Sequence, residues 1–86
     1  MLDSESVQLI EGKFIPEQAK EVLFDLIKSK IEYHKRHKLR GDIIYSEVRI
    51  VELESLLIIV ENVTRQAELK NKKIILFGNI HLKLVD

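Results

Sequence analysis

The sequence contains no cysteine and no tryptophan, and it has one proline and three glycines among its 86 residues. The absence of cysteine excludes disulfides, a thiolate nucleophile and a cysteine-based zinc site, and it fits a reducing cytosol. With so little glycine there is no glycine-rich phosphate loop, and no nucleophile-elbow, Walker-type or HExxH pattern occurs. We therefore expect a non-catalytic protein with no cofactor and no identifiable small-molecule substrate.

Long apolar runs and an excess of charge of one sign are also missing. The longest uninterrupted apolar run covers residues 56–60, far short of the ~20 residues that cross a bilayer. The first six residues include Asp3 and Glu5 and contain neither a basic segment nor a long apolar one, so no signal peptide is expected. Basic and acidic residues number 14 each, which gives a formal net charge of zero. These features predict a cytoplasmic protein that does not associate with membranes.

The chain is 45% hydrophobic and 33% charged, which is typical of one small globular domain. We expect a single domain over residues 1–86, with residues 1–6 as a disordered tail. Residues 7–14 predict a first strand, and the unbroken alternation of residues 74–85 predicts a second. The alternative for the second segment is a hairpin with a two-residue turn at Gly78-Asn79.

Two long helices are predicted between these strands. The first runs from Pro16, a residue that suits the first helical position, to Lys38. The second runs from Ile43 to Asn71. Its glutamates recur every seven residues, which places them on one stripe of a helix but on both faces of a strand. The members of this glutamate stripe are Glu47, Glu54, Glu61 and Glu68.

This order of elements predicts an α+β fold of the β-α-α-β type. A long antiparallel helical hairpin would pack on a small antiparallel sheet formed by the terminal strands. A two-stranded sheet is marginally stable alone, and its free edges invite pairing with another chain. We therefore expect oligomerisation to extend the structure, with a symmetric dimer favoured.

The second helix is apolar over an arc wider than the ~100° that faces a single core. One small sheet and one neighbouring helix are insufficient to cover it, so the surplus predicts a self-associating interaction or structural subunit. The candidate interface residues are Leu53, Leu56, Leu57, Val60 and Val63. Replacing Leu57 by arginine is expected to break the assembly or the fold. Assembly through helices and assembly through sheet edges are both compatible with the sequence.

Residues 12–19 form a Gly-x-Phe-x-Pro-x-x-Ala motif at the entry to the first helix, followed by Leu23, Leu26-Ile27 and residues 30–34. Together with the alternating end at residues 80–84, the chain resembles a family of small uncharacterised bacterial proteins. The connection between the helices is shorter and more apolar than in that family. The resemblance implies the β-α-α-β order; it implies no activity and no site residues.

The densest run of basic side chains ends the first helix and comprises Lys35, Arg36, Lys38 and Arg40. Such a patch could bind phosphates through counterion release, so the alternative function is a weak nucleic-acid-binding module. The zero net charge and the small number of aromatic residues for base stacking argue against it. Basic residues also suit the last turns of a helix, and a solvated helix end is favoured.

His34 and His37 lie on one face of the first helix at a spacing that a metal could use. A third ligand would have to come from elsewhere in the chain, for example from His81 or from a carboxylate such as Glu32 or Glu47. Two imidazoles are not a site by themselves, and the favoured interpretation is that both border the apolar stripe near the helix end. Neighbouring members of the glutamate stripe are roughly 10 Å apart, too far to share one ion. We expect that stripe to be solvated.

Overall fold

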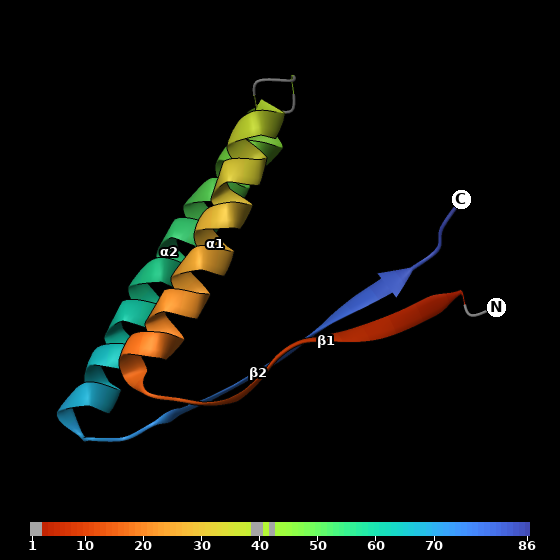
Figure 1. Ribbon diagram of the computed structural model, residues 1–86. Coiled ribbons are helices and arrows are strands. Elements are labelled where there is room, and N and C mark those ends of the chain that lie inside the picture. Colours follow the sequence, from red (N-terminus) through yellow and green to blue (C-terminus); the bar gives the residue numbers. More distant parts are fainter. Residues whose placement is uncertain (1–2, 39–40, 42) are drawn as a thin grey trace.

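The structure, a computed structural model, describes residues 3–38, 41 and 43–86. The chain forms strand β1 (Ser4–Phe14), helix α1 (Pro16–Lys38), helix α2 (Ile43–Leu69) and strand β2 (Ile74–Lys83). The helices form an antiparallel hairpin, and the terminal strands pair in a two-stranded antiparallel sheet (Figure 1). The predicted β-α-α-β fold is confirmed. In the described part of the chain, neither helix combines the length and apolarity that crossing a membrane requires.

Helix α1 begins and ends at the predicted residues. Pro16 occupies the first helical position, where its missing N–H is not needed. The carbonyl of Ile15 accepts the first helical hydrogen bond from the N–H of Ala19, at 3.0 Å. Beyond the helix, Gly41 has a φ of 105°, in the left-handed region that glycine adopts without a Cβ clash. Its N–H donates to the carbonyl of Lys38, the last residue of α1, at 3.3 Å.

Helix α2 ends two residues before the predicted Asn71. Asn71 adopts a left-handed φ of 53°, and its N–H donates to the carbonyl of Glu68 at 3.1 Å. The N–H of Lys72 donates to the carbonyl of Ala67 at 2.8 Å. Together these bonds form a Schellman motif, which satisfies the last carbonyls of the helix and terminates it at Leu69.

Strand β2 is one continuous strand, so the alternative hairpin at Gly78-Asn79 does not form. Strand β1 begins three residues earlier than predicted. Residues 4–6, expected in a disordered tail, pair with residues 81–83, and the N–H of Leu84 donates to the carbonyl of Asp3 at 2.8 Å. Backbone pairing does not require apolar side chains, which is why this polar segment joins the sheet. Residues 1–2 of the expected tail lie outside the described residues.

The hairpin packs on the sheet through α1, which contacts both strands at the base of the hairpin. Farther from this junction the paired strands run away from the helices and give the molecule an L shape (Figure 1). The molecule measures 47 × 36 × 13 Å. Its radius of gyration is 15.9 Å, whereas about 12 Å is expected for a compact domain of this length. The single chain is therefore unusually open.

The core of this open molecule is small. Three hydrophobic side chains are buried among the described residues: Ala19, Ile31 and Leu53. They share the interior with three buried polar side chains: His34, Ser46 and Thr64. Because few side chains are buried, we expect substitutions that leave a cavity at these positions to remove a large fraction of the total stability.

Candidate functional site

The five predicted interface residues are divided between the interior and the surface. Leu53 is 5% exposed and belongs to the core of the single chain. Leu57 and Val60 are half-buried on the same side of α2. Leu56 and Val63 are 42% and 52% exposed. Leu53 therefore offers a partner almost no area. The sequence did not separate these positions because α2 is apolar on most of its circumference.

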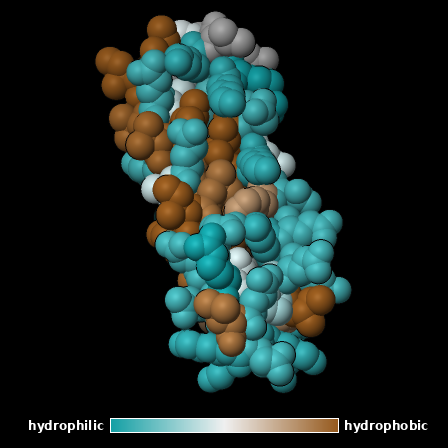
Figure 2. All heavy atoms as spheres, turned by 90° about the vertical axis from the view of Figure 1, so that its left-hand side faces the viewer, coloured by the Kyte–Doolittle hydropathy of each residue, from teal (hydrophilic) through white to brown (hydrophobic). Residues whose placement is uncertain are grey.

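The exposed apolar surface of α2 lies on the side opposite Leu53. Successive residues of a helix are rotated by ~100° about its axis, and this rotation places the exposed apolar residues opposite Leu53 on one arc of α2. We call this arc the outer face of α2; it comprises Ile44, Val48, Val51, Ile58 and Ile59, all more than half exposed. Figure 2 views the molecule from the α2 side and shows hydrophobic side chains in bands between hydrophilic ones. A surface helix of a monomer normally turns such a face to its core.

Ion pairs between the helices occupy a different side of the hairpin. Lys20 Nζ lies 2.6 Å from Glu61 Oε2, and Lys38 Nζ lies 3.0 Å from Glu47 Oε1. Arg65 adds a pair with Glu61 one turn along α2, at 3.2 Å. Two members of the glutamate stripe therefore pair with lysines of α1, while their side chains stay 36% and 54% exposed; the stripe is solvated, as the sequence predicted, and also links the two helices. The lysines that they contact come from a distant segment, which the spacing within α2 does not reveal.

The pair of Lys20 with Glu61 makes the stability depend on pH in the acidic range. The hydrogen bond from Lys20, opposed by partial desolvation and reinforced by the charges of Lys20 and Arg65, lowers the pKa of Glu61 below its ordinary value of 4.5. A carboxyl whose pKa is lower in the folded state stabilises the fold fully above its ordinary pKa. That contribution is lost as the pH falls through the lower, folded-state pKa.

We therefore expect Glu61→Gln to weaken the dependence of Tm on pH between neutral pH and about pH 3. The measurement is thermal unfolding followed by circular dichroism across this range. Glu54→Gln, on the same stripe, is the matched control and should keep the native dependence. Identical pH profiles for Glu61→Gln and the native protein would contradict the assignment.

The basic residues at the end of α1 are partly neutralised. Lys35 Nζ lies 3.5 Å from Glu32 Oε1, and Lys38 pairs with Glu47 as described. Arg36 is exposed and lines a hollow together with acidic as well as basic side chains. The fourth residue of the predicted patch, Arg40, lies outside the described residues. These pairs reduce the positive charge that this end of the hairpin presents to a phosphate backbone.

The two histidines of α1 contact aromatic rings. His34 is buried, and its ring centre lies 5.8 Å from that of Tyr45 on α2 in an edge-to-face arrangement. His37 is half-buried, with its ring centre 4.3 Å from that of Tyr33. In the part of the chain that the structure describes, no three His, Asp or Glu side chains converge as metal ligands. The histidines thus pack the end of the hairpin.

The sheet has an amphipathic end that projects from the hairpin. We call residues 3–8 and 79–84 the arm. Side chains alternate along each strand, and paired residues such as Val7 and Ile80 lie on the same face. The face that we call the apolar face of the arm carries Val7, Ile80, Leu82 and Leu84, all 45–67% exposed, and at its tip Glu5, which pairs with Leu82. The opposite, polar face carries Ser4, Ser6, Gln8, Asn79, His81 and Lys83.

Comparison of the chain with known protein families, with curated proteins and with solved structures finds no match. The resemblance to small bacterial β-α-α-β proteins therefore stays a prediction. The surfaces described above are therefore the basis for proposing a function of this chain.

Proposed function

We propose that this protein is a non-catalytic, self-associating structural or interaction subunit that buries the outer face of α2 against a second copy. The accessible surface of the single chain carries this proposal. It measures 7114 Å². A compact monomer of 10.1 kDa exposes about 5,300 Å², so the excess is about 1,800 Å². A standard stable interface buries about 800 Å² on each partner, so the excess is sufficient for a dimer.

The chemistry of the exposed area supports a permanent contact. The outer face of α2, apart from Ser55, and the apolar face of the arm, apart from Glu5, carry aliphatic side chains, and obligate interfaces between copies are rich in such residues. Soluble monomers rarely leave a contiguous apolar patch of more than a few hundred Å² in water.

A second copy is favoured over a partner of strong charge. The formal net charge of zero means that two copies do not repel one another over long range. In a dimer with twofold symmetry, two copies of the same chain supply both sides of the interface, so no second kind of partner is required. The ion pairs at Lys35 and Lys38 further favour self-association over the alternative of nucleic-acid binding. We place this subunit in the cytoplasm, which its lack of cysteine supports.

The proposal is tested by light scattering after size exclusion, between about 1 and 100 µM protein. We expect a mass of twice the 10.1 kDa of the chain. The double variant Val51→Glu/Ile58→Glu places two charges on the outer face of α2 and should reduce the mass to that of a monomer. Both positions are more informative than Leu57, because Leu57 is half-buried within the chain.

Glu54→Lys is the matched control, since it changes an exposed charge on α2 outside the outer face, and it should leave the mass unchanged. A native protein that stays monomeric at the highest concentration would refute the proposal. An unchanged mass for Val51→Glu/Ile58→Glu would show that the outer face of α2 is not the contact.

A further inference from the structure

We propose that the arm of one copy lies with its apolar face on the outer face of α2 of a second copy. Each protomer would contribute one arm and one helix face to a symmetric, arm-exchanged dimer. This inference rests on the self-association proposed above, and it identifies which element of the second copy covers α2.

The apolar face of the arm lacks sufficient cover within its own chain. Ile80 and Leu82 are 45% and 55% exposed, although they alternate with polar residues as the buried face of a sheet does. Of the two helices of the hairpin, α1 lies on the side of the two-stranded sheet (Figure 1). Its exposed positions are largely charged: Glu17, Glu21, Asp25, Lys28 and Glu32. Such a surface does not replace water favourably around aliphatic side chains, so the arm needs an apolar surface from elsewhere.

The dimensions of the two surfaces match. Six residues of extended strand give the arm a length of about 20 Å. The outer face of α2 runs from Ile44 to Ile59, which is about 22 Å along a helix axis. A helix packed on one face of an antiparallel sheet is also a standard two-layer arrangement, and a two-stranded ribbon gains the cover that its stability requires.

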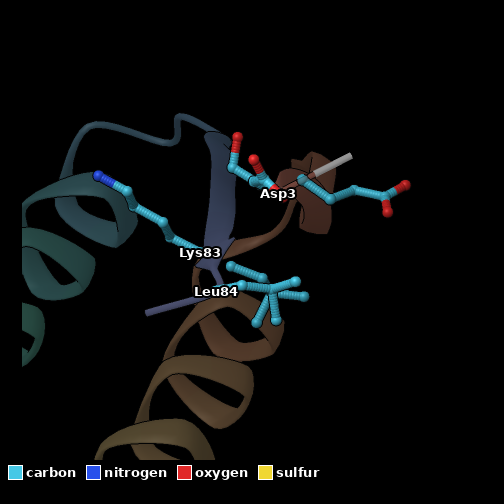
Figure 3. A pocket seen from close by; sticks show the side chains of 6 residues that line it. Asp3, Lys83 and Leu84 are labelled. Atoms are coloured by element: carbon cyan, nitrogen blue, oxygen red, sulfur yellow. The ribbon is translucent and has the colours of Figure 1, made fainter. Parts of the chain in front are cut away.

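Charge gives the arm a direction on the helix. The tip of the arm forms a hollow of about 380 Å³, in which Leu84 and Lys83 point to different sides (Figure 3). Its lining residues are Asp3, Ser4, Glu5, Leu82, Lys83 and Leu84. The far end of the hairpin carries a groove of about 610 Å³, lined by Lys35, Lys38, Glu47, Ile50 and Val51. Asp3 and Glu5 of the tip are complementary to Lys35 and Lys38 of the groove, whose ion pairs with Glu32 and Glu47 leave the lysine side chains 57% and 43% exposed.

Two double variants test the contact by complementation. The arm variant is Ile80→Lys/Leu82→Lys, and the helix variant is Val51→Glu/Ile58→Glu. Each variant alone alters both contacts of a symmetric dimer, so its dissociation constant should rise by at least about 100-fold. In a mixed dimer, one contact is native and the other sets introduced lysines against introduced glutamates. We therefore expect a 1:1 mixture, refolded together, to regain the dimer mass and the native Tm.

Asn79→Lys/His81→Lys is the matched control, because it adds lysines to the polar face of the same strand, and it should remain a dimer. Should a single variant fail to fold, recovery of its circular dichroism in the mixture reports the same complementation. An arm variant that stays dimeric overturns the arm contact and leaves the proposed function standing. A mixture that does not regain the dimer mass, although the native protein is dimeric, also overturns the arm contact. That outcome is expected if α2 packs on α2 of the second copy. A monomeric native protein removes both proposals.

Discussion

Replacing Leu53 by alanine is expected to lower the free energy of unfolding by about 2–4 kcal/mol. Leu53 is 5% exposed and is one of three buried hydrophobic side chains in the described part of the chain. Truncation removes buried methyl groups and leaves a cavity that two facing helices cannot close fully. Small domains have a total stability of roughly 5–15 kcal/mol, so this loss is a large fraction of it.

The measurement for Leu53→Ala is urea unfolding at a fixed protein concentration, because association shifts apparent stability by mass action. Leu56→Ala is the matched control: the same truncation three residues away, at a side chain that is 42% exposed. It should cost less than about 1 kcal/mol in the dissociated chain. Equal losses for the two variants would show that Leu53 is not the centre of the hairpin core.

The second large effect is expected from replacing a small, buried side chain by a larger one. Ala19 is fully buried in α1. Leucine has a helix propensity close to that of alanine, so the local helix should tolerate Ala19→Leu. Because Ala19 is fully buried, the added side chain is expected to displace its neighbours, and overpacking of this kind costs about 1–3 kcal/mol.

For Ala19→Leu we expect Tm to fall by about 4–8 °C for each kcal/mol lost in a domain of this size. Gln18→Leu introduces the same side chain at the preceding, exposed position, and its effect should stay within about 0.5 kcal/mol. Thermal unfolding of both variants by circular dichroism separates a steric effect from a helix-propensity effect. An unchanged Tm for Ala19→Leu would mean that the interior at this position has unfilled space.

The sequence by itself determined the elements and most of their limits. Pro16 sets the start of α1, Gly41 permits the break after it, and alternation through Gly78 keeps β2 in one piece. These features depend on backbone preferences and side-chain periodicity within a few residues, so they can be predicted locally. Three limits differ from the prediction: β1 begins at Ser4 and not at residue 7, α2 ends at Leu69 and not at Asn71, and β2 ends at Lys83 and not at residue 85. Backbone hydrogen bonds, which side-chain periodicity does not reveal, set the first two of these ends.

Only the tertiary structure decided which side of α2 is interior. Leu53 and Ile58 are equally apolar in the sequence, yet one is in the core and the other is 63% exposed. The cross-helix pair of Lys20 with Glu61 and the projection of the arm also depend on how distant segments meet. A helix that is apolar on most of its circumference carries no local signal for its orientation. The packing of α1 fixes that orientation, and with it the surface left for a second copy.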